Sequence, residues 1–439
     1  MKVNFPIVEF PWFGNGNIVA LIAIIHVLIS HGVAIGATAI VVSTEYYAMQ
    51  TKNAKLDQLA KQMTKWIVII TTTIGAMTGV GIWLSTMVIQ PDSIGSLLRI
   101  FFWAWVTEWV IFIGEVVLLL IYYYTWEKWK EGRKKQKHLN IGITLSIFSW
   151  LTMAIITGIL AAKLTPGRWM ETLSFWNAFF NPTYLPSLAF RTFLAVTLTI
   201  SLFTIFVRLF VKDEDVRPQL FRIFSIWGAI SLPATFVFGL WYLKSIPEQA
   251  AKLIVWSTGL PEQTFNVLNI FAFVLIVVFL AWLVIRPKKL PIVLALAMFV
   301  SAIGFIGEFE VVRESVRKPY IIYNYMYVNG ITKAKAEAMN REGYLAHSTI
   351  AKVKEITDEN KLEAGREIYL GQCLACHTID GWRSKRALAN RLDGWSQETI
   401  KSFIPNMHNV RPMMPPFVGT EEELEALAAY LYKVVNEQN

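Results

Sequence analysis

The chain has 439 residues, of which 54% are hydrophobic and only 17% are charged. This composition is too apolar for an ordinary soluble protein of that length and predicts a protein with several membrane-spanning segments. The net charge of +9 does not indicate nucleic acid binding, because the basic residues lie mostly in short loops between apolar runs. Membrane lipids are therefore the expected surroundings, with no nucleic acid partner.

Eight apolar runs are long enough to cross a membrane. They lie near residues 17–48, 64–90, 97–125, 139–162, 186–211, 219–243, 264–286 and 290–312. The first two runs contain several glycines, which are tolerated where helices pack closely. The sequence thus predicts an all-α fold, with a polytopic membrane bundle of about eight transmembrane helices over residues 1–320.

Loops rich in lysine and arginine alternate with poor ones. The rich loops follow the first, third, fifth and seventh runs, and the richest contains KWKEGRKKQK at 128–137. By the positive-inside rule these loops are cytoplasmic. The N-terminus and the C-terminal region are then expected on the periplasmic side of a bacterial inner membrane.

The composition turns polar from about residue 321. Residues 321–359 are expected to form a linker with a short helix, and residues 360–439 are long enough for a small all-α cytochrome c domain. There, Cys373, Cys376 and His377 form C-x-x-C-H, the motif of a covalently attached haem c. The two thiols would bond the haem and His377 would bind its iron. Because both cysteines of the chain belong to this motif, a disulfide framework is excluded.

The sixth ligand of this haem is expected from the segment before the last predicted helix. That segment, NMHNVRPMMPPF, offers Met407, His408, Met413 and Met414. The run MPPF resembles the distal loop of small bacterial cytochromes c, where the methionine before the prolines is the ligand. This favours Met414, while Met407 and Met413 stay open as alternatives.

Few histidines lie in the predicted spans, since only His26 and His31 do so. A haem–copper oxidase needs about half a dozen there, and a cytochrome b of the complex III type needs two pairs, so neither class fits. Carboxylates are the other notable group: Glu108, Glu115, Glu308, Glu310 and Glu314. Each is a functional candidate because a carboxylate in a membrane is costly. Buried ion pairs with Arg191, Arg313 or Arg317 are the alternative.

Four segments resemble cytochrome bd oxidase subunit I: IIHVLISHGVAIG, GAMTGVG, TEWVIFIGEVVLLLIYYYTW and ESVRKPY. The resemblance covers about residues 15–320. It implies two membrane haems, b and b or d. It also implies that His26 is the axial ligand of the active-site haem, that Glu314 ligates the neighbouring high-spin haem, and that Arg317 contacts a propionate. Glu115 matches the inner carboxylate of the family's third helix, and Glu108 matches the outer one with a spacing one residue shorter.

Three departures from that family concern the entry of electrons. Arg191 stands where the family has the histidine of its low-spin haem, and Leu268 stands where it has the methionine. The long quinol-binding loop is missing, because only residues 244–263 connect the sixth and seventh runs. His31 has no counterpart in the family. A role in hydrogen bonding or a proton path is expected for it, with haem ligation as the alternative.

The resemblance and the haem c motif together imply a respiratory oxidoreductase. It would accept electrons through haem c and pass them to the membrane haems, which would reduce oxygen or a related small molecule. The alternative is an electron-transfer and anchoring subunit of a larger respiratory complex. A scaffold without membrane haems is a third interpretation. The expected partners are a second bd-type subunit or a respiratory complex and a cytochrome electron donor.

Overall fold

The computed structural model of the chain describes residues 7–254, 261–286, 290–381 and 386–437. The chain divides into two compact units. The larger, the bundle unit, comprises Ile24–Gly79 and Phe102–Val316. The smaller, the cytochrome unit, comprises Met1–Ala23, Val80–Phe101 and Arg317–Asn439, so it combines the C-terminal part of the chain with two segments from its first quarter.

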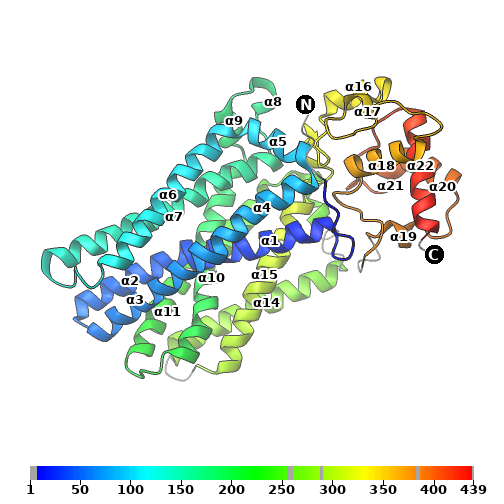
Figure 1. Cartoon of the computed structure of the whole chain (residues 1–439). Coiled ribbons are helices and arrows are strands. Elements are labelled where there is room, and N and C mark those ends of the chain that lie inside the picture. The colour runs from blue at the N-terminus through cyan, green and yellow to red at the C-terminus, as the bar shows by residue number, and fades with distance from the viewer. Residues whose placement is uncertain (1–6, 255–260, 287–289, 382–385, 438–439) are drawn as a thin grey trace. The chain divides into compact units, whose positions relative to one another are not determined.

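Long helices make up the bundle unit (Figure 1). They begin with α1 (Asn15–Ile29) and end with α15 (Ile292–Ser315). Between these lie α2 (Gly36–Thr51), α3 (Ala54–Ile70), α4 (Ala76–Ile89), α6 (Phe102–Thr125), α7 (Gly132–Leu164), α10 (Tyr184–Phe210), α11 (Val216–Ser245) and α14 (Glu262–Ile285), with short helices α8 (Trp169–Thr172), α9 (Phe175–Phe179) and α12 (Glu248–Ala251). The first residues of α1 and most of α4 are assigned to the cytochrome unit.

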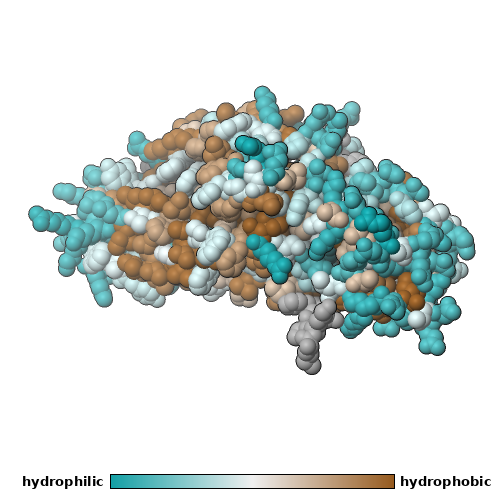
Figure 2. All heavy atoms as spheres, turned by 90° about the horizontal axis from the view of Figure 1, so that it is seen from above, coloured by the Kyte–Doolittle hydropathy of each residue, from teal (hydrophilic) through white to brown (hydrophobic). Residues whose placement is uncertain are grey.

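Seven helical segments among the described residues are long and apolar enough to cross a membrane. They are Asn15–Thr51, Ala54–Ile89, Phe102–Thr125, Gly132–Leu164, Tyr184–Phe210, Val216–Ser245 and Ile292–Ser315. The remaining predicted run, 264–286, coincides with α14, whose described apolar stretch is the shorter Asn266–Trp282. Figure 2 shows mostly hydrophobic side chains on the visible face of the bundle, as expected of helices that face lipid. The all-α polytopic fold is confirmed.

Two of the long segments change to π-helix for about one turn. These turns are η1 (Ser30–Ile35) and η2 (Thr71–Gly75), and they interrupt the segments that contain His26 and Thr78. Such π-turns often lie at functional sites. Helix α10 is the most buried of the long segments and packs on α2, α7, α11, α15 and η1. It therefore forms the centre of the bundle.

The cytochrome unit has its own hydrophobic core. Its elements are α5 (Pro91–Ile100), β1 (Tyr320–Ile322), β2 (Met326–Tyr327), α16 (Lys333–Glu342), α17 (Tyr344–His347), α18 (Lys361–Gln372), α19 (Leu388–Arg391), α20 (Gln397–Phe403), the 3₁₀ turn η4 (Ile404–Asn406), α21 (Met407–Val410) and α22 (Glu421–Asn436). Thr420 and Glu423 form a capping box at the start of α22. The Glu423 carboxylate also accepts hydrogen bonds from the amides of Tyr344 and Leu345, which ties α17 to α22.

Residues 321–359 fold against the rest of the cytochrome unit. Tyr327, Met339 and Leu345 are buried in the same core as α18 and α22. Gly330 has φ +83°, and a Cβ there would lie 2.8 Å from the Ser93 nitrogen, so its backbone lies directly on α5. The borders expected at residues 320 and 360 stay a prediction, but the segment between them is compact.

Candidate haem and electron-transfer sites

The C-x-x-C-H motif lies at the end of α18, in a turn closed by the backbone amides of Cys376 and His377, which donate to the Cys373 carbonyl. The Nδ1 of His377 donates to the Arg386 carbonyl at 2.9 Å. This fixes the ring and leaves Nε2 free to bind a metal. Burial lowers the pKa of His377 to about 4, so its ring is neutral at pH 7, the form that ligates iron. These residues fit haem c.

The predicted distal segment is held by its own backbone and by a histidine. His408 Nδ1 donates to the Met414 carbonyl at 2.6 Å, and the Met414 amide donates to the Arg411 carbonyl at 2.8 Å. Met407, Met413 and Met414 are all partly buried. Met414 as the sixth ligand therefore stays a prediction, and His408 emerges as the residue that anchors its loop.

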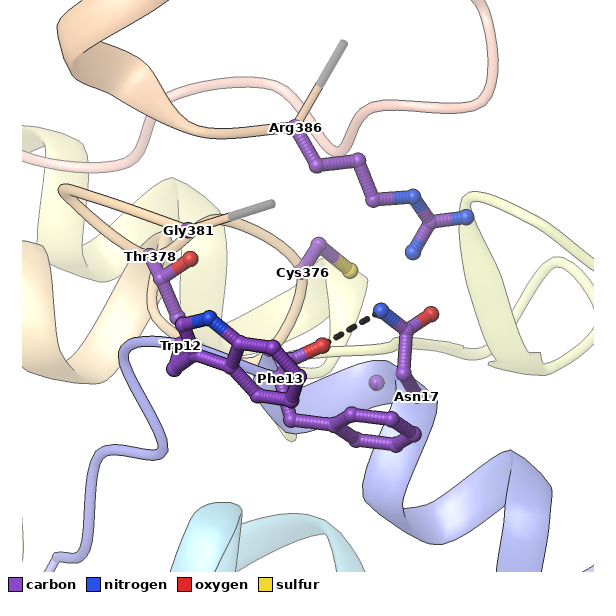
Figure 3. Close-up of a pocket in the computed structure, with 9 residues that line it drawn as sticks. Trp12, Phe13, Asn17, Cys376, Thr378, Gly381 and Arg386 are labelled. Atoms are coloured by element: carbon purple, nitrogen blue, oxygen red, sulfur yellow. Dashed lines mark hydrogen bonds between the residues drawn. The ribbon is translucent and has the colours of Figure 1, made fainter. Parts of the chain in front are cut away.

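A cavity beside the motif is lined from two parts of the chain (Figure 3). Cys376, Thr378, Gly381 and Arg386 line it from the haem c loop. Trp12, Phe13, Gly14, Gly16 and Asn17 line it from the N-terminal segment, which the sequence analysis did not connect with haem c. In Figure 3 the Cys376 sulfur points into the space between Trp12, Asn17 and Arg386.

In the bundle unit, His26 is oriented by the neighbouring span. Its Nδ1 lies 3.3 Å from the Gly75 carbonyl and 3.2 Å from Thr78 Oγ1, which leaves Nε2 free. A Cβ at Gly79 would lie 3.1 Å from His26 Cε1, so the absence of a side chain at this glycine leaves room for the imidazole ring. The geometry fits an axial haem ligand, the role that the resemblance implies for His26.

His31 and Arg191 form a buried pair. Arg191 Nη1 donates to His31 Nε2 at 3.2 Å, and the two residues are 3% and 4% exposed, respectively. His31 Nδ1 then carries the proton and faces Ser30 Oγ at 3.1 Å. The only lone pair of His31 is thus occupied, and Arg191 has donors only, so neither side chain is arranged to bind iron. Leu268 is 52% exposed on α14.

Arg191 has a second notable property. Its guanidinium lies 5.1 Å from the centre of the Phe309 ring, and its Nε is buried with no hydrogen-bond partner in the described part of the chain. Glu310, within electrostatic range of Arg191 and His26, pairs with Arg313 at 2.7 Å. This is the ion pair that the sequence left open for Glu310. The buried Nε is a donor that an anionic group such as a propionate would satisfy.

The carboxylates of α6 lie within electrostatic range of each other. Glu115 accepts hydrogen bonds from Ser149 Oγ at 2.6 Å and from Thr152 Oγ1 at 3.1 Å. Two hydroxyl groups of α7 thus hold this carboxylate in place. Glu308 and Glu314 are partly buried on α15, whereas Arg317 is 2% exposed and donates to the Ile321 carbonyl.

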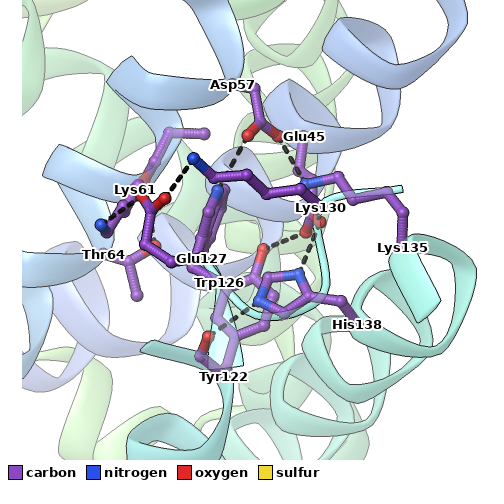
Figure 4. Close-up of polar contacts among 11 residues, drawn as sticks. Glu45, Asp57, Lys61, Thr64, Tyr122, Trp126, Glu127, Lys130, Lys135 and His138 are labelled. Atoms are coloured by element: carbon purple, nitrogen blue, oxygen red, sulfur yellow. Dashed lines mark hydrogen bonds and ion pairs between the residues drawn. The ribbon is translucent and has the colours of Figure 1, made fainter. Parts of the chain in front are cut away.

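A buried polar network was missed by the sequence analysis (Figure 4). Glu45, fully buried, accepts hydrogen bonds from Tyr122 Oη and His138 Nδ1, both at 2.6 Å, and pairs with Lys135 at 2.7 Å. Lys135 also pairs with Asp57. His138 had been placed outside the spans, yet it lies inside α7 with no exposed surface. The available signal was a glutamate inside an apolar run.

Comparison with known proteins finds similarity in both parts of the chain. Residues 360–431 match the family described as cytochrome C oxidase, cbb3-type, subunit III. Among solved structures, the chain is similar to the bd oxidase from Geobacillus thermodenitrificans, with a TM-score of 0.56, 17% sequence identity, and coverage of 74% of this chain and 94% of that one. A search of curated proteins finds no match.

These similarities confirm the fold that the sequence predicted. About three quarters of the chain shares its fold with that bd oxidase, and residues 360–431 form a cytochrome c domain, which implies haem c. With seven apolar helices, the chain is a membrane protein that transfers electrons through haem.

Proposed function

We propose that the chain is a haem oxidoreductase subunit of the cytochrome bd-like superfamily. Electrons would enter through haem c, held by Cys373, Cys376, His377 and Met414, and pass to two membrane haems. Oxygen or a related small molecule would be reduced there. The observation that carries the proposal is the buried Arg191–His31 pair. By the resemblance, Arg191 stands where bd oxidases have the histidine of the low-spin haem that accepts electrons from quinol, so the pair supports another entry for electrons.

The chain's own residues would divide the work as follows. His26 offers Nε2 to the active-site haem, and Glu314 would ligate the neighbouring one. Arg317, buried two residues after the last residue of α15, would hold a propionate, a role suited to its planar donors. Glu115 and Glu108 would move protons, with Ser149 and Thr152 holding Glu115 in place. Bound haem supplies one-electron transfer and a site for the small molecule.

The setting of the protein is part of the proposal. The N-terminus and the cytochrome c domain would lie on the periplasmic side of a bacterial inner membrane, as the distribution of basic residues favours. A second bd-type subunit or a respiratory complex would be the membrane partner. A cytochrome would deliver the electrons.

The test is the reduction of the membrane haems with and without haem c. Purified protein is first analysed for haem by pyridine haemochrome spectra, and haem b or d is expected besides haem c. The Cys373→Ser/Cys376→Ser variant should keep its membrane haems but lose their reduction by a soluble cytochrome. Reduction by quinol at the parent's rate in that variant would show that a quinol site exists and that the proposed entry is wrong. Haem c alone in the parent would contradict the proposal altogether.

The second candidate is an electron-transfer and anchoring subunit without terminal reduction. It is favoured by the residues that the resemblance places at the low-spin ligand positions, since Arg191 is paired with His31 and Leu268 is 52% exposed. Oxygen and nitric oxide consumption by the purified protein, with a reduced cytochrome as donor, separates the two. No consumption of either gas by protein with intact membrane haems would favour this candidate.

A further inference from the structure

The N-terminal segment, residues 7–17, is bound to the loop that carries the haem c motif. The Glu9 carboxylate accepts from the Tyr369 hydroxyl at 3.2 Å and from the Ile379 amide at 3.4 Å. The same hydroxyl lies 3.0 Å from the His377 carbonyl. Glu9 is therefore linked to His377, the predicted iron ligand of the motif, through one intervening side chain, that of Tyr369.

A second attachment lies at the start of α1. Asn15, 1% exposed, donates from Nδ2 to the carbonyls of Leu374 and Val8, each at 3.3 Å. Its Oδ1 accepts from the Phe10 amide at 2.8 Å. Leu374 lies between the two cysteines of the motif. One buried amide thus joins the haem c loop, the N-terminal segment and the first turn of α1.

Close backbone approach supplies the third attachment. Gly381 has φ +142°, and a Cβ there would lie 2.5 Å from the Pro11 carbonyl oxygen. A Cβ at Gly16 would lie 3.3 Å from Arg386 Nη1. The N-terminal segment and the haem c loop thus approach each other at two glycines, where a larger side chain would separate them. Between these contacts, Trp12 and Phe13 line the cavity beside Cys376 (Figure 3).

We propose that residues 7–17 are a docking segment that forms one wall of the haem c site and directs electron exit from haem c into this chain. Electrons leave a porphyrin through its edge, and the thioether bonds of the two cysteines mark such an edge. The segment covers the side marked by Cys376 and continues directly into α1.

This inference rests on the proposed function, since the acceptor is a membrane haem. In the step itself, ferrous haem c loses one electron and becomes ferric, and the acceptor haem changes from ferric to ferrous. No bond or proton is exchanged. The contribution of the segment is to hold the donor and to keep soluble oxidants away from the Cys376 side.

The test uses the full-length, haem-loaded chain and a pair of glycine variants. Gly381→Ala pushes the methyl group into Pro11, whereas Gly394→Ala, at φ +73° with no atom within 4 Å of its Cβ, gives backbone strain without that clash. In Gly381→Ala, hydrogen exchange at the amides of Val8 and Phe10 should rise about tenfold. Oxidation of reduced haem c by hexacyanoferrate(III) should rise at least threefold, and transfer to the membrane haems should slow about tenfold. Gly394→Ala should resemble the parent in all three.

Equal behaviour of the two variants would overturn the inference. If Gly381→Ala fails to acquire haem c, Glu9→Ala carries the test, with Glu9→Gln as its control because the amide oxygen still accepts. Failure of the proposed function is distinguishable. In that case the parent shows no transfer to membrane haems, while hydrogen exchange and the reaction with the soluble oxidant still decide whether the segment is docked.

Discussion

Removal of the Glu45 carboxylate is expected to destabilise the bundle strongly. Three donors converge on this fully buried group: the Tyr122 hydroxyl, His138 Nδ1 and the Lys135 ammonium. Breaking a buried ion pair by removing one partner costs about 3–5 kcal/mol, since a charge is left without compensation. Lys135 keeps its contact with Asp57, so the loss should stay within that range rather than exceed it.

The same network allows the coupling to be measured. Tyr122→Phe removes one hydrogen bond to a charged acceptor, which is worth about 1.5–3 kcal/mol. Because the hydroxyl and the carboxylate contact each other, the double variant Glu45→Ala/Tyr122→Phe should lose less than the sum of the single losses, by about 0.5–3 kcal/mol. Tyr124→Phe is the control, since Tyr124 is 69% exposed on the same helix and should change stability by less than about 0.5 kcal/mol.

The assay is denaturant unfolding of the purified protein in detergent, followed by the signal of its many tryptophans. The free energy of unfolding is compared among the parent, the two single variants, the double variant and the control. A loss below about 1 kcal/mol for Glu45→Ala, or single losses that simply add, would refute the account of a coupled buried network.

The remaining predictions concern haem c, topology and the docking of residues 321–359. Met414→Ala should abolish the sulfur-to-iron charge-transfer band of oxidised haem c and lower its reduction potential, while Met407→Ala should leave both unchanged. A periplasmic reporter fused after Asn439 should be active and a cytoplasmic one inactive. Gly330→Ala should lower the thermal unfolding temperature of the cytochrome unit, since φ +83° and a Cβ 2.8 Å from the Ser93 nitrogen cost at least about 1 kcal/mol. Gly132→Ala, with φ +57° and no atom within 4 Å, should have a smaller effect.

Sequence reasoning located the features that local pattern determines. The bilayer requires helices of a certain length, so apolar runs predict the spans, and the C-x-x-C-H spacing is set by the chemistry of haem attachment. Sequence reasoning missed contacts between residues distant in sequence. Arg191 contacts His31, 160 residues away in the chain, and His138 contacts Glu45, 93 residues away. No periodicity encodes such pairs, because their partners are chosen by the packing of whole helices.

Residues 321–359 are a second case in which contacts between residues distant in sequence could not be predicted. Polar composition from residue 321 suggested a tether, yet that segment owes its order to contacts with α5 and α22 that lie far away in sequence. The N-terminal segment is similar: its glycines and aromatics have no local pattern, and their role emerges only beside Cys376. Where a chain folds back on a cofactor motif, composition alone underestimates the order.

The buried charges of α10 and α15 bear on what the membrane site can hold. Arg191 and Arg313 bring two positive charges into the bundle, and Glu310 compensates one of them through its 2.7 Å pair with Arg313. A buried charge without compensation is unstable in a membrane. If Glu314 ligates an iron, as proposed, its negative charge is not available to balance Arg191. Another anion is then needed within reach of the buried Arg191 Nε. A haem propionate would meet that need, so Arg191, which the resemblance places at the low-spin ligand position, would help to hold a haem without ligating its iron.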